Sequence, residues 1–132
     1  MHAVAALEAA DVASRGIILL SAPDAGIYAG PGWWRALIEA AREAAPGARA
    51  EFILDCGDDA GAAQAAVRAG IEAIVFAGRA DVTARLTAIA VNAGSRLLTQ
   101  RPAAALDLGR WFFADNNELR RRCADALAKG RD

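Results

Sequence analysis

Histidine and cysteine are scarce in this sequence. His2 is the only histidine, and Cys56 and Cys123 are the only cysteines. Two cysteines without a CxxC pair cannot build a disulfide framework, which predicts a reducing, cytoplasmic setting. His2 precedes the first predicted strand, so a cysteine–histidine catalytic pair lacks its partner. A zinc site would need about three or four convergent N, S or O ligands; Cys56, Asp55 and Asp58 could supply some of them, but nothing in the sequence shows that they converge.

The sequence also lacks a surplus of charge and a long apolar run. Its net charge is −1, so no overall field would attract a nucleic acid. No apolar run approaches the roughly 20 residues that span a bilayer, and we expect no membrane partner. The opening "MHAVAALEAAD" carries acids and no basic n-region, so we expect no signal peptide.

What the sequence does contain is a regular alternation of apolar strands and helices. A chain of 132 residues, 55% hydrophobic, suffices for one domain with a buried core. The predicted strands are 17–22, 50–56, 71–78 and 95–100, with a possible fifth within 105–113, and the predicted helices are 3–16, 31–47, 58–70, 80–94 and 115–130. This pattern predicts a single α/β domain over 1–132, with a mainly parallel sheet of four or five strands flanked by helices.

In parallel sheets of this class, ligands bind beyond the carboxyl ends of the strands. That rule selects the loops 21–32, 55–59, 77–81 and 99–102. Backbone N–H groups of the first loop, "SAPDAGIYAGPG", could hold an anion, although its glycines also suit simple turns. The candidate ligand-binding residues are Ser21, Asp24, Gly26, Tyr28, Gly30, Asp58 and Gln100.

Asp55 and Cys56 stand at the tip of the second predicted strand. Asp55 could act as an acid or base, and Cys56 as a thiolate or metal ligand. The structural alternative is that Asp55 caps the next helix or binds loop N–H groups, while Cys56 packs as a small buried hydrophobe. Either interpretation fits the sequence.

Several segments, in order, resemble the class II, metal-dependent ketose-bisphosphate aldolases. The segment 3–30 ends in "YAG" after a helix, an apolar strand and Ser21, as in that family. The next strand ends in "LDC", where the family has "LDH", and "AAVRAGIEAIVFAGR" and "LTAIAVNAGSRLLTQ" resemble the family's following segments. The resemblance covers roughly residues 3–100, and the segment 103–132 is additional. It implies strands of a TIM barrel, with about half of the eight present.

The resemblance also implies roles for particular residues. Asp55 stands at the position of the catalytic aspartate, and Gln100 falls near a metal-associated glutamate. Cys56 replaces the first metal-binding histidine, and the other metal histidines lie in the missing half. Metal Lewis acidity would have to stabilise the enediolate, so the loss of the metal set argues against catalysis.

We therefore expect a non-catalytic aldolase-like domain that binds a small anionic or phosphorylated ligand or a protein partner, and no cofactor. One alternative is an active aldehyde-lyase whose metal site, holding zinc, is rebuilt from Cys56 and acids. Another is a flavodoxin-like regulatory or scaffold domain. Removing half of a barrel exposes strand edges, so we also expect a homo-oligomer. Trp111–Phe113, an aromatic cluster, and Trp33 are its candidate contacts, and a tail that folds back onto a monomer is the alternative.

Overall fold

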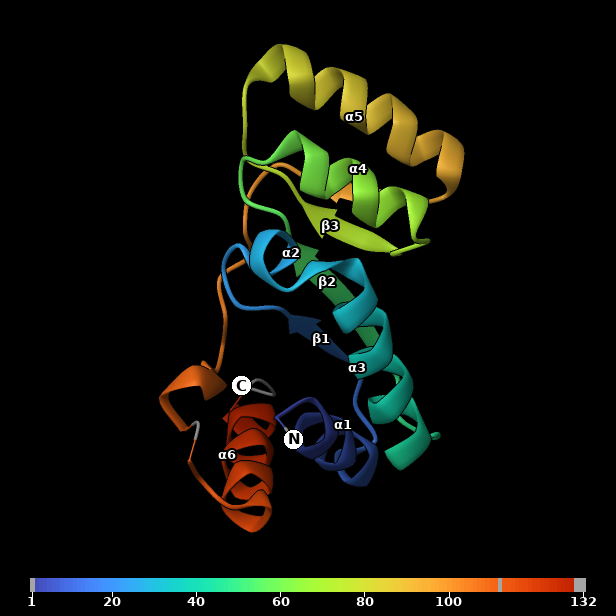
Figure 1. Cartoon of the computed structure of the whole chain (residues 1–132). Helices are drawn as coiled ribbons and strands as arrows, with labels where there is room; N and C mark the ends of the chain where they lie inside the picture. The colour runs from blue at the N-terminus through green and yellow to red at the C-terminus, as the bar shows by residue number, and fades with distance from the viewer. Residues whose placement is uncertain (1, 112, 130–132) are drawn as a thin grey trace. The chain divides into compact units, whose positions relative to one another are not determined.

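A computed structural model describes residues 2–111 and 113–129 of the chain. Its elements alternate along the sequence, as the hydrophobic pattern predicts (Figure 1). The helices are α1 His2–Ala13, α2 Ala25–Tyr28, α3 Gly30–Ala44, α4 Ala60–Arg68, α5 Ala80–Ala93 and α6 Asn116–Lys129, and a 3₁₀ helix covers Leu108–Trp111. The strands are β1 Ile17–Leu20, β2 Ala50–Asp55, β3 Ala73–Val75 and β4 Arg96–Leu98.

The four strands form one parallel sheet in the order β1-β2-β3-β4. In the register, Leu54 of β2 lies opposite Ile74 of β3, and Ile74 lies opposite Leu97 of β4. Both the predicted fold class and the predicted sequential order are confirmed. The possible fifth strand is not formed among the described residues, because 108–111 form the 3₁₀ helix instead.

The chain divides into two compact units. One comprises segments within 1–19, 37–51 and 103–132, and the other comprises 20–36 and 52–102. In the first unit, α1 and α6 pack side by side over a cluster that includes Ala6, Ala9 and Cys123 (Figure 1). Cys123, on α6, is buried in this cluster.

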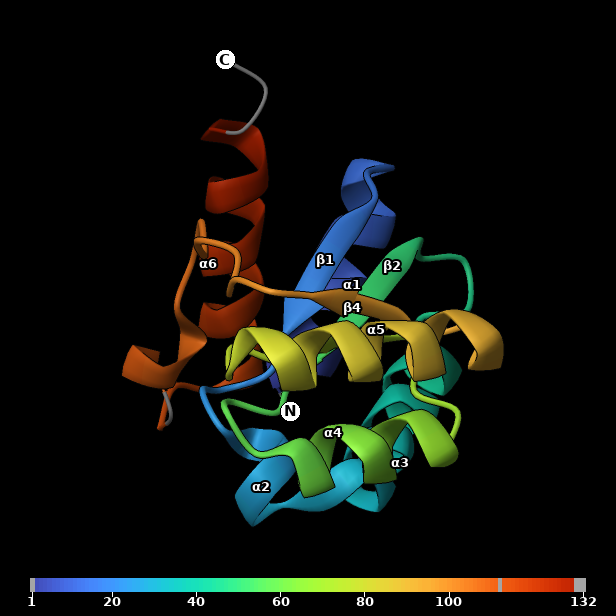
Figure 2. The ribbon, with the colours of Figure 1, turned by 90° about the horizontal axis from the view of Figure 1, so that it is seen from above.

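The second unit has its core on the sheet. Ile53, Ala73 and Val75 are buried together, with Leu20 and Leu98 packed against them. In this unit α4 lies beside both α2 and α5 (Figure 2). Because the strands are parallel, the loops after β2, β3 and β4 lie at one edge of the sheet, which is the edge that the sequence selected for function.

Several element ends differ from the prediction. The helix predicted to end at Gly16 ends at Ala13, where Ser14 takes a left-handed conformation at φ 54°. The loop 21–32 contains the short helix α2, and α3 begins at Gly30, with Pro31 in its first turn. Asp115 caps α6, since its Oδ1 accepts the Glu118 N–H at 2.8 Å.

The aromatic residues expected at an oligomer contact are placed differently from one another. The Arg122 guanidinium stacks 3.7 Å from the centre of the Trp111 ring, so Arg122 partly covers Trp111. Phe113 and Trp33 are exposed, whereas Trp34 is buried with its ring edge against Phe52. Phe112 lies outside the described residues. Among the described residues, no helix has the length and hydropathy needed to cross a membrane.

Candidate functional site

Asp55 is the last residue of β2, and its carboxylate is held from two sides. Oδ1 accepts the Gly57 N–H at 2.8 Å, and Oδ2 forms an ion pair with Nη1 of Arg101, also at 2.8 Å. The residue is only 5% exposed. Charge-assisted hydrogen bonds of this kind are stronger than neutral ones, so the carboxylate is fixed in position.

The chain must turn sharply after β2 for the Gly57 N–H to reach Asp55. Gly57 has φ +56°, which a glycine adopts without steric cost. A Cβ at this position would lie 2.2 Å from Oδ1 of Asp24. The turn therefore requires glycine both for its conformation and for the close approach of Asp24.

The prediction that Asp55 caps the following helix is wrong, whereas the prediction that it binds a loop N–H is confirmed. The cap of α4 is Asp59, whose Oδ1 accepts the Ala62 N–H at 2.9 Å. The helix begins at Ala60, and Asp59, directly before it, has the extended backbone that an N-cap needs. Asp55 is still in the strand and cannot reach the helix amides.

Ser21 follows β1 and is buried. Its hydroxyl accepts the Asp55 N–H at 2.9 Å and donates to the Ala22 carbonyl at 3.0 Å. Its own N–H donates to the Ile53 carbonyl at 3.0 Å. The hydroxyl is thus used within the fold, where it fixes the end of β2 against the start of the loop 21–32.

Cys56 is fully buried, and its environment keeps the thiol neutral. Burial raises the pKa of Cys56 to about 12, with the nearby Asp55 and Asp59 carboxylates adding to the effect. Gly26 packs directly against it, since a Cβ at residue 26 would lie 2.7 Å from the Cys56 Sγ. The structural interpretation of Cys56 as a small buried hydrophobe fits this packing, and a reactive thiolate does not.

The site lacks a group of metal ligands. Across residues 2–111 and 113–129, no three His, Cys, Asp or Glu side chains lie where they could hold a metal ion together. Asp58, which the zinc alternative would use beside Asp55 and Cys56, is exposed. The donor set that the zinc alternative requires is therefore not assembled by these residues.

The remaining candidates from the sequence are not gathered around Asp55. Tyr28 and Gln100 are exposed, and Asp24 takes a left-handed conformation at φ 62°. Gly30 has φ +82° and open space around its α-carbon, so only its conformation calls for glycine. Of these residues, the structure brings Asp24 to Gly57 but does not gather the others around Asp55.

Arg101 is the residue of this candidate site that sequence reasoning missed. It follows Gln100 at the tip beyond β4, and Asp55 ends β2, so both lie at the carboxyl edge of one parallel sheet. An aspartate at the end of β2 and an arginine just after β4, at the same edge of the sheet, are a signal that the sequence does contain. Arg79 also lies at this edge, where it is the N-cap residue of α5. Its side chain makes no capping hydrogen bond and instead pairs with Asp81 at 3.0 Å.

Comparisons of the chain with protein-family models, curated proteins and solved structures found no match.

Proposed function

We propose that this chain is a non-catalytic α/β domain, related to the class II aldolase barrels, that binds a small anionic or phosphorylated ligand beyond β3 and β4. The observation that carries the proposal is the ion pair between Asp55 and Arg101. The ion pair engages the carboxylate of Asp55, the residue at the position of the family's catalytic aspartate. It also holds an arginine at the edge where α/β sheets bind ligands.

The environment of Asp55 supports a structural rather than a catalytic role. A general base must have a lone pair within hydrogen-bond reach of its substrate. Both carboxylate oxygens of Asp55 accept from partners inside the fold, and the residue is buried. Beside it, Cys56 carries a neutral thiol instead of a metal-binding imidazole.

The order of the strands favours the barrel relationship over the flavodoxin-like alternative. Flavodoxin-like sheets have the order 2-1-3-4-5. A TIM barrel adds each strand beside the previous one, which gives the sequential order found in this sheet.

The cationic part of the edge lies after β3 and β4. Arg101 uses one guanidinium nitrogen for Asp55, and about a third of its side chain (34%) remains exposed. Arg79 pairs with Asp81 in the first turn of α5, but 80% of its side chain stays exposed at the N-terminus of that helix, where the helix dipole also favours an anion. Asp58 and Asp59 follow β2 and disfavour an anion there. The proposed ligand therefore lies against the loops 76–79 and 99–102.

A titration with inorganic phosphate tests this proposal. Backbone amide NMR shifts should change in a saturable way at 77–81 and 99–102. Arg79→Gln should weaken binding, because it removes a cation from the site. The matched control is Arg85→Gln, since Arg85 is 78% exposed and also approaches Asp81, but lies farther along α5. The absence of saturable shifts, or equal weakening by both substitutions, would overturn the proposal.

A further inference from the structure

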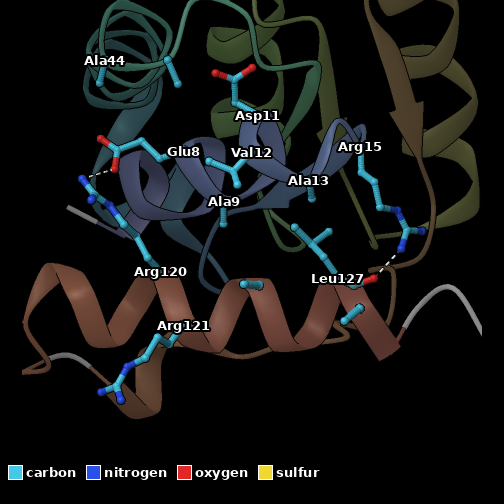
Figure 3. Close-up of a pocket in the computed structure, with 13 residues that line it drawn as sticks. Glu8, Ala9, Asp11, Val12, Ala13, Arg15, Ala44, Arg120, Arg121 and Leu127 are labelled. Atoms are coloured by element: carbon cyan, nitrogen blue, oxygen red, sulfur yellow. Dashed lines mark hydrogen bonds and ion pairs between the residues drawn. The ribbon is translucent and has the colours of Figure 1, made fainter.

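An open groove lies on the surface of the first unit. Its floor and walls come from α1, the end of α3 and α6, and its volume is about 680 Å³ (Figure 3). Small apolar side chains dominate the lining, among them Ala9, Ala44 and Ala124. Val12 stands in this surface with 89% of its area exposed. Small residues of this kind allow another helix to approach closely, so the groove has the form of a helix-packing surface.

Two charged side chains flank the groove without an ion-pair partner among the residues that the structure describes. Asp11 and Arg121 are both exposed, and Figure 3 shows them pointing to opposite sides of the groove. The other charged groups of the lining are engaged. Glu8 forms an ion pair with Arg120, and Arg15 donates to the Leu127 carbonyl. The groove thus offers one carboxylate, on Asp11, and one guanidinium, on Arg121, on either side of an apolar strip.

We propose that this groove is the contact surface for a second copy of this chain. A two-fold axis lying along the groove would exchange its two sides. Arg121 of each copy would then face Asp11 of the other, and the apolar strips around Val12 would meet. A two-fold interface requires such a self-complementary surface. A foreign partner would have to supply its own matching acid and base, whereas a second copy already carries both.

This contact differs from the one expected at Trp111–Phe113 and Trp33. It is also independent of the anion site, because its residues come from α1, α3, α6 and the positions just after α1 and α3, and none of them is in the loops 76–79 or 99–102.

Sedimentation velocity of the full chain, over a range of micromolar concentrations, tests the proposal. The wild type should sediment as a dimer, and Val12→Glu should sediment as a monomer, because it places a charge in the apolar strip. Val91→Glu is the matched control, since Val91 is 69% exposed on α5 in the other unit, and it should remain dimeric. Far-UV circular dichroism verifies that each variant is folded.

A charge exchange makes the test specific to the pairing. Asp11→Arg and Arg121→Asp should each weaken dimerisation by about tenfold or more, because like charges then face each other. The double variant should recover most of the wild-type affinity, since the pairs reform with opposite polarity. A wild type that stays monomeric as its concentration rises would overturn the proposal. So would a dimer that Val12→Glu leaves intact, or a double variant without recovery.

Discussion

The ion pair between Asp55 and Arg101 joins residues 46 positions apart in the chain. Asp55 could be predicted as a noteworthy residue, because an acid at the end of an apolar strand is visible in the sequence. Its partner could not be selected in the same way, because β3 lies between β2 and β4 and the approach depends on how the sheet curves. Which acid caps α4 was also open, since the choice depends on the residue at which the helix begins.

A prediction at the same scale concerns the thiol of Cys56. Because its pKa is raised to about 12, only about one thiol in ten thousand is ionised at pH 8. We expect the native protein to react very slowly with Ellman's reagent at Cys56, and the rate to increase as the pH is raised above 8. Comparison of the native protein with Cys123→Ala isolates this residue. Rapid reaction of Cys56 at pH 8 under native conditions would contradict the burial described here.

At the scale of elements, the sequence predicted types and order better than ends. Gly70 and Gly94 were assigned to the ends of α4 and α5, and both have the positive φ that favours glycine there. The end of α1 was misplaced because Ser14, which is not glycine, takes the left-handed conformation. The short α2 was missed because one turn of helix leaves no periodic pattern to detect.

The cap of α4 gives a prediction at this scale. Asp59→Ala should lower the free energy of unfolding by about 1 kcal/mol, because the Ala62 N–H loses its acceptor. Urea denaturation of the wild type and the variant measures the difference. Asp58→Ala serves as the control, since Asp58 is exposed in the same loop and should have little effect. Equal destabilisation by the two substitutions would show that Asp59 is not the cap.

At the scale of the whole molecule, the parallel order of the sheet followed from uniformly apolar strands separated by helices. The groove over α1 could not be predicted from the same pattern. It depends on how α6, from the additional segment 103–132, packs against α1. The amphipathic stripe of α6 shows that the helix packs, but it does not specify which neighbour the helix meets.

The proposed lack of catalysis predicts the behaviour of the intact protein with an aldolase substrate. We expect no cleavage of fructose 1,6-bisphosphate, with or without added zinc, because the described residues assemble no metal-ligand group and Asp55 is paired. A coupled assay for the triose phosphate products measures cleavage. Turnover that requires zinc and disappears in Asp55→Asn would instead support the aldehyde-lyase alternative.

The central claim is that the acid at the catalytic position of the aldolase pattern serves the fold. The unfolding free energy of Asp55→Ala, set beside that of the wild type and of Asp58→Ala, tests it most directly. The ion pair and the Gly57 hydrogen bond predict a loss of about 2–3 kcal/mol for Asp55→Ala and almost none for Asp58→Ala. An unchanged or increased stability in Asp55→Ala would contradict the claim, because it would mark Asp55 as a residue retained for function at a cost in stability.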